Sequence, residues 1–194
     1  MTVTKQESER PPDPLEIWVG RQAGGLSTSY CAHLPSTSAT LALLRSTSET
    51  SDPVPSSVWP LLATFPPELL GAGDTPSPSE AAAALALRMF AYHQQGRHDA
   101  PVHARGQRFG RALRELGLAL SQDGQLAPGV VRRFQAMGTA NEFGELTWHL
   151  RQIVGMLRAE RVRLDYGLLA VDLRAWQSPE RRPRVLTSWS RAFY

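Results

Sequence analysis

The sequence predicts an all-α protein, and three observations lead to this prediction. Apolar residues recur at helical spacing through most of the chain, alternating strand patterns are missing, and residues that start or stop helices stand at the ends of the periodic segments. With 194 residues, of which 42% are hydrophobic, the chain is long enough to bury a real core. We expect helical bundles arranged as an N-terminal and a C-terminal sub-bundle.

The first part of the chain is rich in proline and irregular, since eleven of the fifteen prolines precede residue 80. We predict a disordered tail over 1–14 and an N-terminal helical sub-domain over 15–78. Its first helix is expected to begin near Leu15 and to weaken or end at Gly24-Gly25. The remaining predictions here are a helix over 38–44 capped by Ser36 or Ser38, a loop over 46–57, short helical turns in SVWPLL and PPELLG, and a linker over 71–78.

The second part, residues 79–194, shows longer periodic segments and is predicted to form the C-terminal bundle. Its first helix opens at Ser79-Glu80 and stops at Gly96, which is a good helix terminator. Three more helices are expected over 105–120, 127–138 and 142–159. Asp165 is placed to cap the next helix, and Ser178 is a candidate cap for the last one.

Several classes of protein do not fit the composition and the motifs. The single cysteine, Cys31, allows no internal disulfide framework and no cysteine-rich zinc site. No apolar run is long enough to span a membrane, and no secretory signal is visible, so we expect a cytoplasmic protein. Glycine-rich nucleotide motifs, Walker A and zinc-protease motifs are missing, so we expect no enzyme activity and no cofactor.

Two groups of residues are candidates for chemistry, but each has a simpler interpretation. His93, His98 and His103 are spaced five apart, but Gly96 separates them, so solvated histidines are favoured over a metal site. Asp165 and Asp172 could act as paired acid and base in a small hydrolase. A helix cap and a partner for a neighbouring arginine are the favoured roles of the two carboxylates.

The charge of the chain is divided unevenly. Residues 1–80 carry four Lys and Arg against nine Asp and Glu, a net charge of −5. Residues 81–194 carry seventeen Arg against nine acidic residues, a net charge of +8. This asymmetry predicts that the second part of the chain faces an anionic partner, and arginine suits phosphate because its planar guanidinium offers a fork of donors.

Arginines also recur at helical spacing. One stripe lies on the predicted 105–120 helix, a second on the 142–159 helix, and two pairs stand near helix starts. These candidates are Arg108, Arg111 and Arg114, then Arg151 and Arg158, and the pairs Arg132-Arg133 and Arg181-Arg182. Glycines near the first stripe, Gly106 and Gly110, are expected to let a phosphate approach the backbone.

We expect Arg111, Arg132, Arg133 and Arg151 to turn outward into one continuous groove, because the apolar stripes of their helices must meet in the core. Aromatic residues are not interleaved with these arginines in the sequence. The pattern therefore favours binding to the nucleic-acid backbone over stacking on bases.

The order of the motifs resembles a known family. The sequence contains FGRALRELG, then VVRRFQAM, then LTWHLRQIVGMLRAERVRLDYGLLAVDLRAWQ, then RVLTSWSRAFY, with SSVWPLL and ALRMFAYHQQG upstream. Together these segments resemble the CasB family, the small subunit of the Cascade surveillance complex in type I-E CRISPR systems. The resemblance covers residues 15–194 and is strongest from about residue 80 onward.

The resemblance implies a non-enzymatic, all-helical subunit that acts in antiviral defence. It implies other Cascade subunits as partners, a head-to-tail homodimer, and a basic surface that holds guide RNA and target DNA and stabilises the R-loop. The positions that match the family's basic sites are Arg45, Arg111, Arg132, Arg133, Arg151, Arg181 and Arg182. The alternative is a helical protein–protein scaffold whose arginines meet acidic protein partners and no nucleic acid.

Overall fold

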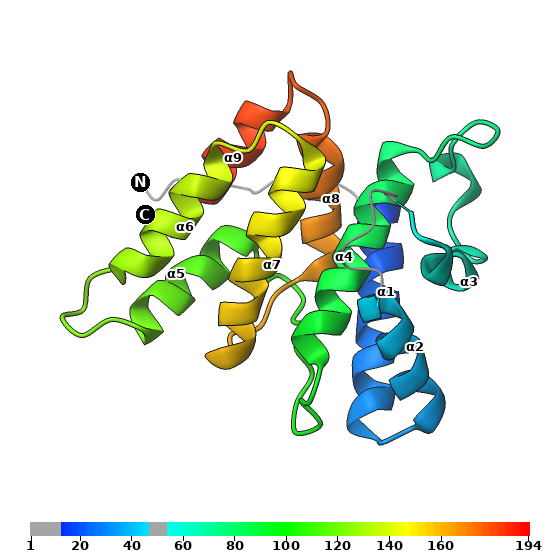
Figure 1. Cartoon of the computed structure of the whole chain (residues 1–194), viewed down its shortest axis with the longest axis horizontal. Coiled ribbons are helices and arrows are strands. Elements are labelled where there is room, and N and C mark those ends of the chain that lie inside the picture. The colour runs from blue at the N-terminus through cyan, green and yellow to red at the C-terminus, as the bar shows by residue number, and fades with distance from the viewer. Residues whose placement is uncertain (1–12, 47–53) are drawn as a thin grey trace, which may run out of the picture.

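The computed structural model describes residues 13–46 and 54–194, and in this part of the chain every regular element is a helix, as predicted. The N-terminal elements are α1 (Pro14–Cys31), α2 (Pro35–Ser46), the 3₁₀ turn η1 (Ser56–Val58), α3 (Trp59–Leu62), the 3₁₀ turn η2 (Pro67–Leu69) and α4 (Pro78–Gln94). The C-terminal elements are α5 (Phe109–Ala119), α6 (Pro128–Gly138), α7 (Phe143–Ala159), α8 (Tyr166–Trp176) and α9 (Arg182–Phe193) (Figure 1).

The first helix begins inside the segment that was predicted as a tail. A carboxylate oxygen of Asp13 accepts a hydrogen bond from the backbone N–H of Leu15 at 3.0 Å, so Asp13 is the N-cap. Pro14 follows directly, and a proline is favourable at the first position of a helix. The predicted tail is therefore wrong at residues 13 and 14, and residues 1–12 lie outside the described part of the chain.

The glycine pair in α1 does not end the helix, in contrast to the prediction. α1 continues through Gly24-Gly25 to Cys31. Its second half is anchored to α4, because the buried hydroxyl of Ser27 donates a hydrogen bond to the side-chain oxygen of Gln94 at 2.8 Å. Packing against α4 thus outweighs the roughly 1 kcal/mol of helix propensity that each glycine costs.

The region after α1 is partly as predicted. α2 begins at Pro35, so Ser36 and Ser38 lie within its first turn and do not cap it as predicted. Both predicted short turns are present, as η1 with α3 and as η2. Most of the predicted 46–57 loop, residues 47–53, lies outside the described part.

The helix α4 stands at the centre of the molecule. Ser77 and Glu80 form a reciprocal capping box, with the Ser77 hydroxyl accepting from the Glu80 N–H at 3.0 Å and the Glu80 carboxylate accepting from the Ser77 N–H at 2.8 Å. The helix starts at Pro78, inside the predicted linker, and the chain turns at Gly96 with φ +73°. α4 packs against α1, α2, α7 and α8 (Figure 1), and α1 also packs directly against α8.

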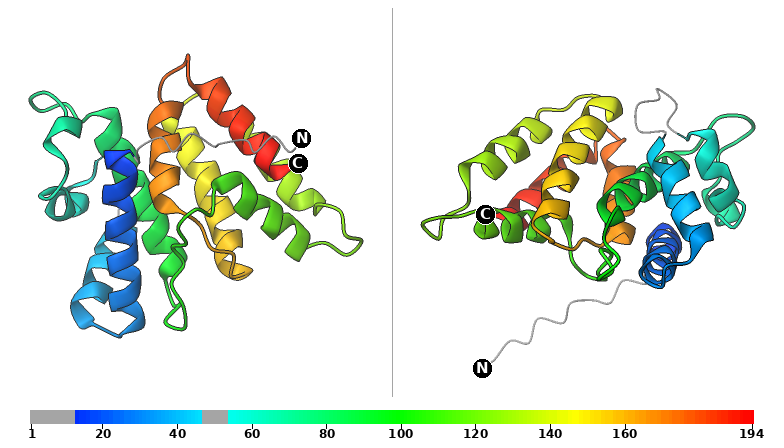
Figure 2. Two further views of the ribbon diagram at one scale, coloured as in Figure 1. Left: turned by 180° about the vertical axis from the view of Figure 1, so that it is seen from behind. Right: turned by 60° about the horizontal axis from the view of Figure 1, so that its bottom comes forward.

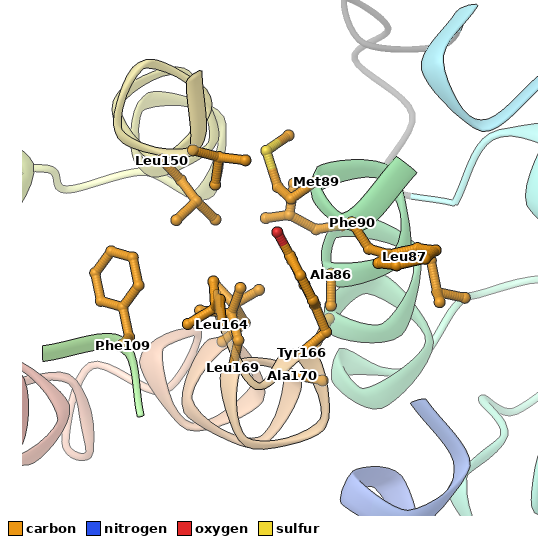
Figure 3. Packing of buried hydrophobic residues seen from close by; sticks show 14 of the residues in the cluster. Ala86, Leu87, Met89, Phe90, Phe109, Leu150, Leu164, Tyr166, Leu169 and Ala170 are labelled. Atoms are coloured by element: carbon orange, nitrogen blue, oxygen red, sulfur yellow. The ribbon is translucent and has the colours of Figure 1, made fainter. Parts of the chain in front are cut away.

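The core lies where α4, α7 and α8 meet, and Tyr166 occupies its middle (Figure 3). The Tyr166 ring packs edge-on against Phe90 with centroids 5.5 Å apart, and its hydroxyl is hydrogen-bonded to His93 Nδ1 at 2.7 Å. Asp165 caps α8 as predicted, accepting the N–H groups of Gly167 and Leu168. This cap fixes the start of α8 within the apolar core.

The helix α5 starts four residues later than predicted because Asp165 also holds the preceding loop. The N–H of Gly106 donates to the Asp165 carboxylate at 2.6 Å, and the Asp165 N–H donates to the carbonyl of Gln107 at 2.8 Å. Gly106 has φ +81°, a left-handed conformation that favours glycine. The chain therefore becomes helical only at Phe109.

The N-cap of the last helix, α9, is Arg181, so the prediction that Ser178 caps it is wrong. The Ser178 backbone carbonyl instead accepts the N–H groups of Arg181 and Arg182. Its buried residues are Val185, Trp189 and Phe193, which follow helical spacing. Throughout residues 13–46 and 54–194, every helix is too short or too polar to cross a bilayer.

Candidate nucleic-acid interface

Two helices that are far apart in the sequence, α5 and α9, enclose an open groove of about 900 Å³. The view from behind shows the two helices together beside the C-terminus (Figure 2). Five arginines line this groove with small and polar residues of α9. The lining residues are Arg108, Arg111, Arg114, Pro183, Arg184, Thr187, Ser188, Arg191 and Ala192.

The groove contains the first predicted arginine stripe and two arginines that sequence reasoning missed. Arg184 and Arg191 come from α9, where they stand seven residues apart with Thr187 and Ser188 between them. Thr187, Ser188 and Arg191 follow Arg184 by three, four and seven residues. This helical spacing places the four side chains on one face of α9, opposite the buried face formed by Val185, Trp189 and Phe193. The signal was present in the sequence, but nothing local showed that this face meets α5.

Gly110 brings α5 and α9 close together. A Cβ atom at Gly110 would lie 2.4 Å from the carbonyl oxygen of Trp189 and 2.7 Å from the Cβ of Ala192. The prediction that Gly110 exposes backbone to a phosphate is therefore wrong, because α9 covers it. Gly106 has open space around its Cα, but its N–H is already bound to Asp165.

The groove arginines have few acidic neighbours. In the described part of the chain, none of the five takes part in an ion pair within 4 Å. Arg114 donates to the backbone oxygens of Phe193 and Tyr194 at 3.1 and 2.7 Å, which fixes it along α9. The other four guanidinium groups carry positive charge on an exposed surface, and their mutual repulsion favours binding of an anion.

Two acidic side chains near the groove have raised pKa values. Burial raises the pKa of Asp172 to about 6, against the opposing effects of its hydrogen bond from Trp189 Nε1, at 2.7 Å, and of the Arg108 charge. Burial also raises the pKa of Glu16, and the nearby Asp165 acts in the same direction. Asp172 therefore anchors α9 through Trp189 instead of pairing with an arginine as predicted.

The predicted pair Arg132-Arg133 lines a second, smaller pocket between α6 and α7. This pocket measures about 320 Å³ and also contains Ala136, Trp148, His149 and Gln152. Both arginines are exposed, and Trp148 is 60% exposed. The sequence analysis found no aromatic residue interleaved with the arginines, but the structure places Trp148 of α7 beside Arg132 and Arg133 of α6.

Arg151 and Arg158 form a third basic site, on α7 beside the end of α4. Their guanidinium carbons lie 4.4 and 5.6 Å from the centre of the Tyr92 ring. A Cβ on Gly155, which stands between them, would lie 3.0 Å from the Tyr92 hydroxyl, so the glycine makes room for this ring. Of the arginines predicted to form one groove, Arg111 lines the α5–α9 groove, Arg132 and Arg133 line the α6–α7 pocket, and Arg151 lies over the Tyr92 ring.

The remaining predicted residues lie elsewhere. Arg182 stacks on the Trp176 ring with its guanidinium carbon 4.0 Å from the ring centre, and Arg181 is exposed beside it. Arg45 lies half-buried near the end of α2, in the N-terminal part of the molecule. Cys31, the single cysteine, is partly buried.

The histidines and the aspartate pair have structural partners. The prediction of solvated histidines is wrong for His93, which is fully buried and hydrogen-bonded through Nδ1 to the Tyr166 hydroxyl. His103 Nδ1 accepts the Tyr166 N–H at 3.2 Å, and the exposed His98 stacks on Tyr30 with ring centres 4.1 Å apart. In residues 13–46 and 54–194, histidine, cysteine and carboxylate side chains form no cluster of three that could hold a metal ion. Asp165 uses its carboxylate to bind three backbone N–H groups.

We expect His93 to make the fold sensitive to acid. Burial, with a smaller contribution from the nearby Arg97 charge, lowers the His93 pKa from 6.5 to about 3. The unfolded chain therefore takes up this proton first, and stability falls as the pH decreases from 6.5 toward 3. Acidification to about pH 5.5 costs about 1.4 kcal/mol through this one group.

Urea titrations of the wild type and of His93→Gln at neutral pH and at pH 5.5 measure this effect. The variant is less stable at neutral pH because it loses the native packing, but it loses less stability on acidification. An equal acid-induced loss in both proteins would show that His93 is not the sensitive group.

Comparisons with known proteins agree with this architecture. The family model of the CRISPR-associated protein Cse2 matches residues 40–194. The crystal structure of CasB from Thermobifida fusca superposes with a TM-score of 0.75 at 29% sequence identity, covering 94% of this chain and 98% of that chain. A Cse2-family CRISPR-associated protein from Thermus thermophilus has a TM-score of 0.64 at 23% identity, covering 95% and 97% of the two chains, and supports the fold alone.

No curated protein matches the sequence. The segment that the family model matches contains α3 to α9, and with them the α5–α9 groove and the two other basic sites. The resemblance drawn from the sequence motifs is thereby confirmed, and the chain belongs to the Cse2 family of CRISPR-associated proteins.

Proposed function

We propose that this chain is the small, non-catalytic subunit of a cytoplasmic CRISPR Cascade complex, in which it binds the backbone of guide RNA and target DNA and stabilises the R-loop. Membership of the Cse2 family supports a place among the other Cascade subunits. The proposal includes a head-to-tail pairing of two copies there. The observation that carries the nucleic-acid part of the proposal is the α5–α9 groove, where five arginines gather without an ion pair in the described part of the chain.

The chemistry of the groove suits a phosphate backbone. The described residues of the lining provide planar guanidinium groups and the hydroxyls of Thr187 and Ser188, and they include no aromatic ring or carboxylate. Guanidinium groups and hydroxyls bind phosphate oxygens, which are the same along any strand. Contacts of this kind position a nucleic acid without reading its sequence.

Binding is expected to weaken steeply with salt, because each arginine that contacts a phosphate releases condensed counterions. If the four groove arginines other than Arg114 contact phosphates of a duplex, the logarithm of the binding constant falls with the logarithm of the salt concentration with a slope near −3.6, which is about −0.9 for each phosphate. Fluorescence anisotropy with labelled duplexes of two unrelated sequences, measured over a series of salt concentrations, gives this slope.

The same titration distinguishes the competing function. A helical scaffold whose arginines meet only acidic proteins would bind neither duplex, or would bind with a slope near zero. Equal affinity for the two sequences together with a steep slope supports backbone binding. Nucleic acid that co-purifies with the chain, seen as high absorbance at 260 nm, supports it independently.

A further inference from the structure

The pocket between α6 and α7 differs from the α5–α9 groove because it contains an exposed aromatic ring. Trp148 lies in the second turn of α7, and 60% of its surface is exposed. The apolar face of α7, formed by Leu146, Leu150, Ile153, Val154 and Leu157, is buried in the core. Trp148 is two residues from both Leu146 and Leu150, so the helical twist turns it away from that core.

The Trp148 ring has few contacts of its own. The one ring contact found for it in the described part of the chain is the edge-on neighbour His149, with centroids 4.9 Å apart. An indole that is this exposed gives up most of the stabilisation that burial of so large a side chain would provide. Its exposed ring is therefore available to a partner with a flat surface.

The surroundings of Trp148 are cationic and polar. Arg132 and Arg133 stand on α6 across the pocket, both exposed and outside every ion pair found in the described part of the chain. Among the described residues, Arg133 donates to the backbone carbonyl of Gly129, at 3.3 Å. Gln152 and His149 add side chains that can donate and accept hydrogen bonds.

We propose that this pocket binds an unpaired nucleotide, with the base stacked on Trp148 and the flanking phosphates held by Arg132 and Arg133. The inference rests on the proposed function and adds a preference for single-stranded segments at this place. A base inside a duplex is already stacked on both faces and cannot lie on the indole, whereas an unpaired base can.

The composition of the pocket favours a nucleotide over a protein segment. Among the described residues that line it, the apolar side chains are Trp148 and Ala136, which would leave a protein partner with little apolar surface to bury. A nucleotide combines a flat aromatic base with an anionic phosphate, and the pocket combines an indole with two guanidinium groups. This charge complementarity is what identifies the occupant.

The test compares Trp148→Ala, Trp148→Phe and the wild-type chain. Three ligands are needed: a short single strand of mixed sequence, the same strand with abasic sites along its length, and the corresponding duplex. We expect Trp148→Ala to weaken binding of the intact single strand roughly fivefold or more, which is the range for loss of one base–aromatic stack. Affinity for the duplex stays unchanged, and Trp148→Phe retains most of the single-strand affinity.

The abasic strand provides the decisive comparison. The wild type should lose affinity when the bases are removed, while Trp148→Ala should bind the intact and abasic strands more nearly alike. Trp59→Ala is the matched control, because Trp59 is 49% exposed on α3 and lines neither the α5–α9 groove nor the two other basic sites. This control should bind all three ligands like the wild type.

Each contrary result has a definite meaning. Equal weakening of single strand, abasic strand and duplex would show a general effect on the basic surface and would overturn the stacking proposal. Unchanged nucleic-acid binding by Trp148→Ala, together with loss of assembly with other Cascade subunits, would make Trp148 a protein contact and also overturn it. Absence of salt-dependent binding to any of the ligands by the wild type would overturn the proposed function as well.

Discussion

Simultaneous replacement of Arg111, Arg184 and Arg191 by alanine is expected to remove most of the nucleic-acid affinity of the chain. These three arginines line the α5–α9 groove from both helices, and all are exposed. Loss of each contact to phosphate costs on the order of 1 kcal/mol, so three together weaken binding roughly 100-fold. The slope of the salt dependence should decrease by about three, one for each removed contact.

The choice of these three positions keeps the fold intact. Arg114 is left in place because it binds backbone oxygens at the end of α9, and Arg108 because it lies near Asp172 and Glu16. Removing three exposed cations from one groove relieves repulsion, so the melting temperature should not fall. A triple Arg→Lys variant keeps the charge and loses only the fork of donors, so it should bind much better than the alanine variant.

A charge-matched control separates the groove from the general charge of the protein. Arg21, Arg105 and Arg163 are also exposed and lie outside the groove lining. Their combined replacement by alanine removes the same net charge and should weaken binding far less. Equal weakening by the two triple variants would mean that overall charge, and not the α5–α9 groove, determines binding. Early melting of the groove variant would instead identify its arginines as structural.

Asp165→Ala is expected to destabilise the fold severely. The Asp165 carboxylate is 3% exposed and accepts three backbone N–H groups, from Gly106 at 2.6 Å, Gly167 at 2.9 Å and Leu168 at 3.1 Å. Alanine removes a helix cap and leaves three backbone donors without a partner, of which the Gly167 N–H is buried, and these losses together cost about 3 kcal/mol. That is a large share of the stability of a typical domain.

The midpoint of urea denaturation, followed by circular dichroism at 222 nm, measures this loss. Asp165→Asn keeps one acceptor oxygen and should fall between the alanine variant and the wild type. Asp165 has a structural role, because it connects the start of α8 to the loop that leads into α5, and it does not line the α5–α9 groove. Nucleic-acid binding by the variant should therefore decrease only in proportion to the loss of folded protein. A wild-type midpoint for Asp165→Ala would show that water satisfies these donors and that the carboxylate is dispensable.

Helix ends were predicted well where the signal is local. The sequence predicted the Asp165 cap of α8, the end of α4 at Gly96 and, within one residue, the start of α6 at Pro128. Each of these depends on hydrogen bonds or backbone angles within one turn. Prediction failed where distant contacts decide. α1 runs through Gly24-Gly25 because it is anchored to α4, and α5 begins late because Asp165, almost sixty residues further on, holds the preceding loop.

The same division applies to the basic surfaces. The sequence by itself determined that the fold is all-α and that arginines share helix faces, because the 3.6-residue period places side chains on faces without reference to the rest of the chain. Only the tertiary structure decided which faces adjoin. Gly110 lets α9 approach α5 and thereby adds Arg184 and Arg191 to the first stripe, while the packing of α6 on α7 brings Arg132-Arg133 next to Trp148. Such pairings depend on how helices pack over the whole core, and no local pattern encodes that arrangement.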